Sequence, residues 1–250
     1  MSAAESTGRR TPSWVTAAAP AGRARLGRAA LVAFALATAL DLGSLLAGWH
    51  LGHVIAKPLL MPLLVVHVCT GGRGGTRGVP RLLVAALLLG WGGDLALLFD
   101  AEAAFLIGMG CFSAGHVCYL VLFGRRTTNP LLGGAYALAL VGTVGLMWSD
   151  LPADLRIPVA GYSLLLTTMA YRSSAMGLRA GVGGALFLVS DMIIATGVAA
   201  WPQPPRPDFW IMATYLAAQY LLATGSLAAR EAYRGEAPQG HHPRGQHPRG

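Results

Sequence analysis

Eight long apolar segments, separated by short polar connections, occupy the chain between residues 29 and 229. Each approaches the roughly 20 apolar residues that an α-helix needs to cross a bilayer. The pattern predicts an all-α, polytopic membrane protein with eight transmembrane helices. The predicted spans are residues 29–47, 53–70, 82–99, 103–123, 130–148, 155–172, 180–200 and 209–229.

The two ends of the chain are polar and rich in Gly, Pro and Arg. Such segments cannot bury enough apolar surface to fold, so we expect both ends to be disordered. The chain then divides into a basic N-terminal tail (1–28), a transmembrane domain (29–229) and a C-terminal tail (230–250) rich in His, Arg, Gly and Pro.

The composition agrees with a membrane protein. Apolar residues make up 54% of the 250 residues and charged residues only 12%. A soluble domain carries about 25% charged residues, so a soluble enzyme is excluded. The net charge of +8 does not indicate a nucleic-acid partner, because the arginines lie in short connections between apolar segments.

The distribution of arginine predicts the orientation in the membrane. Every arginine except Arg156 and Arg206 lies in a tail or in one of the three alternate connections around residues 71–81, 124–129 and 172–179. Basic connections face the cytoplasm, so both termini are expected there. We expect a multi-pass protein of the cell (plasma) membrane.

Ionisable side chains inside the predicted spans are costly in a bilayer and mark candidate functional sites. Counted from the basic residue at the cytoplasmic end of each span, Asp41, Asp94 and Asp191 lie about 18–20 Å deep. Lys57 falls near the same layer, and His116 lies one to two turns closer to the cytoplasm. Clustered in one cavity, these groups form either a structural polar network or the acid and base groups of a catalytic site.

The segment 103–123 has one aromatic and polar face. Phe105, Gly108, Phe112, His116 and Tyr119 fall within an arc of about 80° on a helix. Because His and Tyr need hydrogen-bond partners inside a membrane, we expect this face to border the cavity.

Two further features point to the same cavity and to tight packing around it. Pro58 and Pro62 free backbone carbonyls beside Lys57, and these carbonyls need protein or a cavity next to them. The glycine pair 183–184 allows two helices to approach closely.

Five motifs, taken together and in this order, resemble the YhhN family of membrane proteins. They are Lys57-Pro58-Leu-Leu-Met61-Pro62, Gly93-Asp94-Leu-Ala-Leu-Leu, the pattern F-x2-G-x3-F-x3-H-x2-Y from Phe105 to Tyr119, Gly184-Ala185-Leu-Phe187-Leu-Val-Ser190-Asp191, and Tyr215-Leu-Ala-Ala-Gln219-Tyr220. The resemblance covers the second to the eighth predicted helix.

The resemblance implies a lysoplasmalogenase, which cleaves the vinyl ether bond of the lysophospholipid lysoplasmalogen. The products are a fatty aldehyde and glycerophosphoethanolamine or glycerophosphocholine. Protonation of a vinyl carbon gives an oxocarbenium-like cation, so the site needs one protonated carboxyl group and one carboxylate, as glycosidases do. This chemistry requires no metal and no nucleotide cofactor.

We assign the two catalytic carboxyl groups to Asp94 and Asp191, without deciding which is the acid. Lys57 either holds one of them ionised or binds the headgroup phosphate. Further candidates for binding the substrate or positioning water are Asp41, Met61, Phe105, Phe112, His116, Tyr119, Phe187, Tyr215 and Gln219.

Two other functions also use polar groups inside a membrane. An intramembrane aspartyl protease would need a G-x-G-D motif, but Trp91 stands at the position of the first glycine. A proton-coupled transporter or a lipid-binding protein would suit the layer of Asp and Lys side chains. Product formation in detergent separates enzyme from transporter, because transport needs two compartments.

Overall fold

The computed structural model describes residues 13–71 and 78–236. Within these ranges the chain forms α-helices and a short 3₁₀ helix and contains no strand. The elements are α1 (Ser13–Ala47), α2 (His50–Gly71), α3 (Arg81–Ala96), α4 (Glu102–Phe123), α5 (Pro130–Met147), α6 (Arg156–Ser173), η2 (Ser174–Met176), α7 (Leu178–Val198) and α8 (Pro207–Glu236). The all-α class predicted from the sequence is confirmed.

Helices α1 and α8 extend beyond the predicted spans. Residues 13–28 and 230–236 are helical, so the prediction of disorder was wrong for these two stretches. That prediction weighed low apolarity and the Gly and Pro content, whereas Ala, Arg and Glu favour a helix in water as well. The remaining parts of the two predicted tails, 1–12 and 237–250, lie outside the described residues.

Among the described residues, six helices are long and apolar enough to cross a membrane, and the chain is therefore a multi-pass membrane protein. The six segments are Ala21–Ala47, His50–Thr70, Glu102–Phe123, Pro130–Met147, Leu178–Val198 and Pro207–Tyr233. Of the other two helices, α3 has 16 residues, and α6 has 18 with Arg156 and Arg172 near its ends. The count of eight spans stays a prediction.

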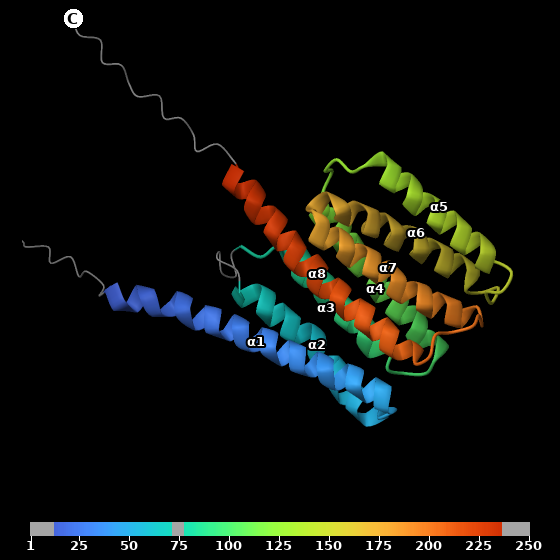
Figure 1. Ribbon diagram of the computed structural model, residues 1–250, viewed down its shortest axis with the longest axis horizontal. Helices are drawn as coiled ribbons and strands as arrows, with labels where there is room; N and C mark the ends of the chain where they lie inside the picture. Colours follow the sequence, from blue (N-terminus) through green and yellow to red (C-terminus); the bar gives the residue numbers. More distant parts are fainter. Residues whose placement is uncertain (1–12, 72–77, 237–250) are drawn as a thin grey trace, which may run out of the picture.

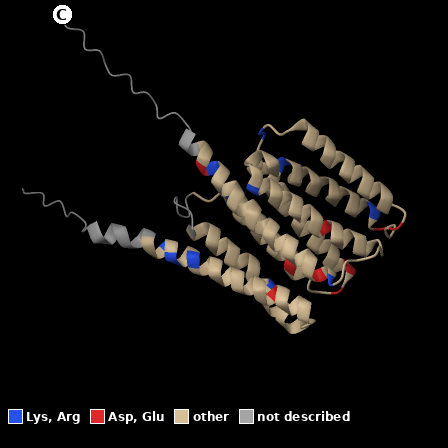
Figure 2. Cartoon of the chain, viewed as in Figure 1, with Lys and Arg blue, Asp and Glu red and all other residues tan. Residues whose placement is uncertain are grey.

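The helices run up and down, and charged residues divide the bundle into two ends (Figures 1 and 2). We call the end with the α1–α2, α3–α4, α5–α6 and α7–α8 connections the acidic end. Its acidic residues are Asp100, Glu102, Asp150, Asp154 and Asp208. The opposite end, which we call the basic end, carries Arg81, Arg125, Arg126, Arg172 and Arg179.

Antiparallel neighbours form the main packing pairs, α1 with α2, α3 with α4, and α7 with α8. Helix α8 also contacts α1 and α2, so it links the first helix pair to the rest of the bundle. Helix α5 lies at the outer edge, packs against α6, and buries only Met147 (Figure 1). One side of the bundle is therefore a single, lightly packed helix.

Close helix contacts near the basic end depend on glycine. A Cβ atom on Gly183 would lie 2.8 Å from the backbone nitrogen of Leu222 in α8. A Cβ atom on Gly184 would lie 2.9 Å from the Cα atom of Ala170 in α6. The close approach predicted for this glycine pair is confirmed, and it fixes α7 between α6 and α8.

Candidate active site

A pocket with an empty volume of about 1070 Å³ lies inside the bundle, lined by residues from α2 to α8. Its polar lining residues are Lys57, Asp94, Thr143, Tyr162, Ser163, Thr167, Ser190, Asp191 and Tyr215. The remaining lining is apolar and reaches to α5. A long apolar lining beside a few convergent polar groups suits an amphipathic ligand.

The pocket occupies the half of the bundle nearer the acidic end. Its lining residues on α4 run from Phe105 to Phe112, in the first half of that helix. On α5, which runs the opposite way, they run from Leu140 to Met147, in the second half. The half nearer the basic end holds a packed core that includes Leu64, Leu83, Phe123, Met169 and Leu222. The pocket is thus closed toward the basic end.

Two prolines and a tryptophan bring Lys57 and Asp94 to the same pocket. Pro62 has no N–H to donate to the carbonyl of Pro58, four residues earlier in α2. Nε1 of Trp91 in α3 donates to this carbonyl instead, at 2.8 Å. Lys57 directly precedes Pro58, and Asp94 follows Trp91 by three residues on the same side of α3. The bond therefore holds together the parts of α2 and α3 that carry Lys57 and Asp94, which both line the pocket.

Asp94 lies at the end of a directed chain of hydrogen bonds. It is 3% exposed, and Tyr215 donates its hydroxyl to Oδ2 at 2.8 Å. Nε2 of Gln219 donates to the Tyr215 hydroxyl at 3.3 Å, and Tyr119 donates to Oε1 of Gln219 at 2.9 Å. Lys57 lines the same pocket without forming an ion pair in the described part of the chain. Asp94 is held as an acceptor, the role that a carboxylate plays.

Asp191 belongs to a second chain of hydrogen bonds, from α4 and α6. Tyr162 donates its hydroxyl to Oδ2 of Asp191. Because Tyr162 has a single hydroxyl hydrogen, Nε2 of His116 is the donor in its 3.2 Å contact with that oxygen. Nδ1 of His116 is then an acceptor, buried and without a partner among the described residues. The imidazole of His116, with its free basic Nδ1, is thus linked to Asp191 through the hydroxyl of Tyr162.

Aromatic side chains form the wall between the pocket and the residues behind it. The ring of Phe112 meets those of Phe187 and Tyr215 edge to face, with centroid distances of 6.2 and 5.9 Å. Phe187 meets Tyr215 at 5.4 Å and His116 at 4.8 Å in the same manner. Such pairs favour one relative orientation, so they fix the directions of the Tyr215 hydroxyl and of the imidazole.

Most of the predicted site residues meet at this pocket. The six that line it are Lys57, Asp94, Phe105, Phe112, Asp191 and Tyr215. The four that lie behind its wall, in the hydrogen-bond chains or the aromatic cluster, are His116, Tyr119, Phe187 and Gln219. Met61 does not reach the pocket, because it lies one turn beyond Lys57, fully buried in the core.

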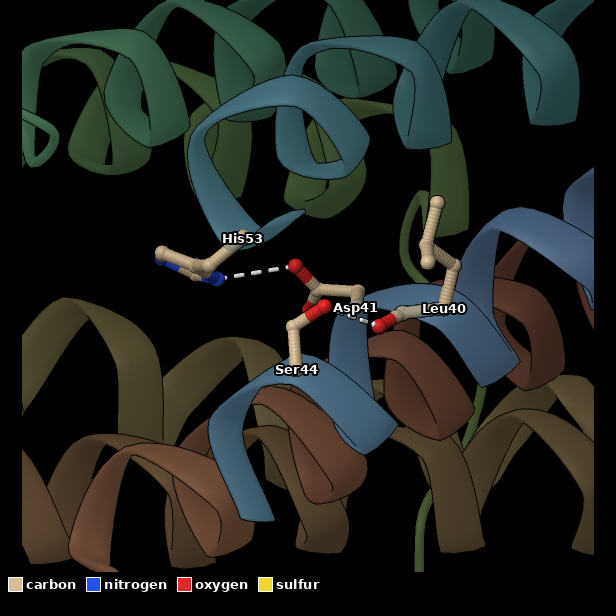
Figure 3. A network of polar contacts seen from close by, with 4 residues as sticks. All are labelled: Leu40, Asp41, Ser44 and His53. Atoms are coloured by element: carbon tan, nitrogen blue, oxygen red, sulfur yellow. Dashed lines mark hydrogen bonds and ion pairs between the residues drawn. The ribbon is translucent and has the colours of Figure 1, made fainter. Parts of the chain in front are cut away.

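Asp41 lies outside the pocket, in the contact between α1 and α2 (Figure 3). Its Oδ1 accepts from Nδ1 of His53 at 2.8 Å, and its Oδ2 has no partner among the described residues. Ser44, one turn along α1, donates to the carbonyl of Leu40 at 2.6 Å. Asp41 therefore ties α1 to α2 through His53, a residue that the sequence reading did not single out.

Helix α6 supplies pocket residues that the sequence reading missed, namely Tyr162, Ser163 and Thr167. The prediction began from ionisable groups, and the interior of the 155–172 span contains no Asp, Glu, Lys or His. Counted from Arg172, Tyr162 lies about 15 Å deep, close to the layer of the aspartates. The same depth count extended to tyrosine identifies it.

The fold and the pocket define a polytopic α-helical membrane protein with a largely apolar pocket between its helices that contains two carboxyl groups. The chain belongs to the YhhN family, which it matches over residues 52–226. The resemblance seen in the sequence motifs is thereby confirmed over α2 to α8. No solved structure matches the chain.

Three curated relatives illustrate the similarity. Lysoplasmalogenase TMEM86B of Sus scrofa is 36% identical over 164 residues, which is 66% of this chain and 70% of the relative. Lysoplasmalogenase TMEM86B of Homo sapiens is 37% identical over 141 residues, which is 56% of this chain and 61% of the relative. A lysoplasmalogenase of Mycobacterium tuberculosis is 30% identical over 159 residues, which is 58% of this chain and 61% of the relative.

Proposed function

We propose that this protein is a lysoplasmalogenase, a hydrolase that cleaves the vinyl ether bond of lysoplasmalogen inside the membrane. The observation that carries the proposal is the pair Asp94, which is buried, and Asp191, which is half-buried, on the wall of one largely apolar pocket. The names of the relatives support the same substrate. The products are a fatty aldehyde and glycerophosphoethanolamine or glycerophosphocholine.

The reaction consumes one water and returns every proton. A carboxyl group protonates the β-carbon of the vinyl ether, the C=C bond becomes a C–C single bond, and positive charge develops on the carbon and oxygen of the ether. A carboxylate stabilises this cation and takes a proton from the water that attacks it. The protonated base then gives its proton to the glycerol oxygen, which leaves as an alcohol, while the ionised acid takes the hydroxyl proton of the hemiacetal. The aldehyde forms, and both carboxyl groups return to their starting states.

The surroundings of the two carboxyl groups suggest their roles. The ammonium group of Lys57 shares the pocket with Asp94 and balances a negative charge there, so we assign Asp94 as the carboxylate that stabilises the cation. Asp191 makes no ion pair in the described part of the chain and its hydrogen-bond partner is the neutral phenol of Tyr162, so we assign it as the acid. His116 and Tyr162 act as positioning residues for Asp191.

The apolar part of the pocket fits the alkenyl chain. It is lined by Phe105 and Met109 of α4, by Leu140 and Val144 of α5 and by Ile194 of α7. We call this part the apolar arm. Since the carboxyl groups lie at its polar end, a chain in the arm presents its vinyl ether to Asp94 and Asp191.

We further propose that all eight helices span the cell (plasma) membrane with both termini in the cytoplasm. The basic connections at one end and the acidic connections at the other support this orientation (Figure 2). The acidic end, and with it the pocket, then faces the outer leaflet.

The experiment that tests the proposal is aldehyde release from lysoplasmalogen by purified protein in detergent. Asp94→Asn and Asp191→Asn are compared with Asp154→Asn, an exposed acid in the α5–α6 connection. We expect the first two variants to lose about 10²–10⁴-fold in kcat, the usual contribution of acid–base groups, and the third to keep its activity.

Three outcomes contradict parts of the proposal. An inactive wild-type protein overturns the substrate assignment and favours a transporter or a lipid-binding protein. Full activity in both pocket variants overturns the two-carboxyl mechanism. Equal losses in all three variants show that the losses do not come from the pocket.

A further inference from the structure

A second pocket lies at the acidic end, between the α1–α2 turn and the start of α8. Its empty volume is about 880 Å³, and its walls include Trp49, His53, Arg206, Asp208 and Phe209. In contrast to the apolar arm of the first pocket, this lining combines a cation, an anion and two aromatic rings. A site of this composition suits a polar ligand that carries both charges.

Arg206 differs from the other arginine of the acidic end. Arg156 uses its guanidinium to donate to the carbonyls of Leu151 at 3.1 Å and Ser149 at 3.2 Å. Arg206 makes no side-chain hydrogen bond or ion pair with any described residue. Its Nη1 lies 3.7 Å from the position of a Cβ atom on Gly48, so the side chain reaches from the start of α8 to the α1–α2 turn.

The backbone at both sides of this contact is left-handed. Arg206 has a φ of 57° and Gly48 a φ of 72°. Glycine adopts this conformation without strain, whereas an arginine rarely does. The fold therefore holds Arg206 in an unfavourable backbone conformation. Its guanidinium lies across the pocket and has no hydrogen-bond partner among the described residues.

The two pockets are neighbours along α2. His53, whose ring is fixed by Asp41, lines the second pocket, and Lys57 lines the first. Four residues apart, they lie on the same face of the helix at a separation of about 6 Å along its axis. The glycerol backbone of a lysolipid spans a similar short distance between the vinyl ether oxygen and the phosphate.

We propose that the second pocket binds the zwitterionic phosphoethanolamine or phosphocholine headgroup of the lysolipid. Arg206 binds the phosphate, because guanidinium matches its geometry with two parallel hydrogen bonds. The Asp208 carboxylate and the rings of Trp49 and Phe209 surround the amine, which aromatic faces attract. The inference rests on the proposed function and names the part of the substrate that the first pocket leaves out.

The test uses two substrates that differ only in the phosphate-bearing headgroup, 1-alkenyl-glycerophosphoethanolamine and 1-alkenylglycerol. We expect Arg206→Gln to raise KM for the first about tenfold, the effect of one lost charged hydrogen bond, with kcat within twofold. For 1-alkenylglycerol the variant keeps the wild-type KM. Arg206→Lys, which keeps the charge without the paired hydrogen bonds, restores part of the loss.

One control and one further variant make the result specific. Arg125→Gln removes an exposed arginine from the basic end and leaves both KM values unchanged. A second test variant, Asp208→Asn, raises KM for the ethanolamine lipid more than KM for the corresponding lipid with a bare phosphate. Equal changes for both substrates in Arg206→Gln, or no change for either, overturn the headgroup site.

A binding measurement separates this inference from the proposed function. Glycerophosphoethanolamine, added to the wild-type protein in detergent, changes the fluorescence of Trp49, and the change is absent in Trp49→Phe and in Arg206→Gln. Inorganic phosphate alone and phosphatidylethanolamine vesicles, added separately, show whether a free anion or a bilayer surface produces the same signal. Binding without hydrolysis overturns the function and keeps the site, whereas hydrolysis without headgroup binding overturns the site.

Discussion

The two halves of this bundle are built from the same helices, yet they differ in packing. The half near the basic end is closely packed, and we call it the solid half; the half near the acidic end contains the first pocket, and we call it the hollow half. Near the basic end, small residues bring α6, α7 and α8 into backbone contact around a core that includes Phe123, Met169 and Leu222. Near the acidic end, the same helices separate around a pocket with two carboxyl groups. Apolar burial drives helix association weakly inside a bilayer, so close packing must hold the bundle together. Close packing in the solid half therefore offsets the free-energy cost of the polar groups in the hollow half.

The largest effect that tests this division is expected at Gly183. Gly183→Val places a side chain where the backbone of Leu222 lies, 2.8 Å from the would-be Cβ. We expect a loss of about 3 kcal/mol or more in the free energy of unfolding, because neither backbone can give way. Thermal unfolding in detergent measures it, with Gly134→Val as the control, since a Cβ on Gly134 meets nothing within 4 Å. Equal stability of the two variants would show that the α7–α8 contact does not hold the bundle.

A smaller effect is expected from filling the hollow half. Val144 of α5 lines the apolar arm, whereas Val141 of the same helix is 69% exposed on the outer face. Val144→Trp shortens the arm, so kcat/KM falls about tenfold for long alkenyl chains and stays unchanged for short ones. Val141→Trp leaves the whole chain-length series unchanged. A uniform loss at every chain length in Val144→Trp contradicts the placement of the chain in this arm.

Counting residues along the helices placed several groups correctly and misplaced one. Depth along a helix follows from the sequence, and Asp94, Asp191 and Lys57, expected in one layer, do line one pocket. Asp41 has the same depth but belongs to α1, which contacts α2 and α8 at the edge of the bundle. Depth is one of three coordinates, and the order of helices around the bundle comes from packing that a single sequence does not reveal.

The ends of the helices were harder to predict than their centres. Apolarity identifies the part of α1 within the membrane, but the helix continues to residue 13 on the propensity of Ala and Arg. The contribution of α6 to the pocket was missed for a different reason. Its polar side chains, Tyr162, Ser163 and Thr167, carry no charge at neutral pH, so they give a weaker signal in an apolar segment than an aspartate does.

The smallest effect concerns the boundary between the two halves, where Trp91 donates to the carbonyl of Pro58. Trp91→Phe keeps the apolar ring and removes the donor. We expect a loss of about 1 kcal/mol in the free energy of unfolding, because the carbonyl freed by Pro62 loses its partner. We also expect a lower kcat/KM for lysoplasmalogen, because the bond holds together the parts of α2 and α3 that carry Lys57 and Asp94.

Trp148→Phe is the matched control, since Trp148 makes no side-chain hydrogen bond with any described residue and is 40% exposed. Thermal unfolding and aldehyde release are measured on the same preparations. Reduced stability with unchanged kcat/KM would show that the bond holds α2 to α3 without setting the site. Reduced kcat/KM with unchanged stability would show the opposite. Only a loss of both, absent in Trp148→Phe, supports a single bond that joins the solid half to the chemistry of the hollow half.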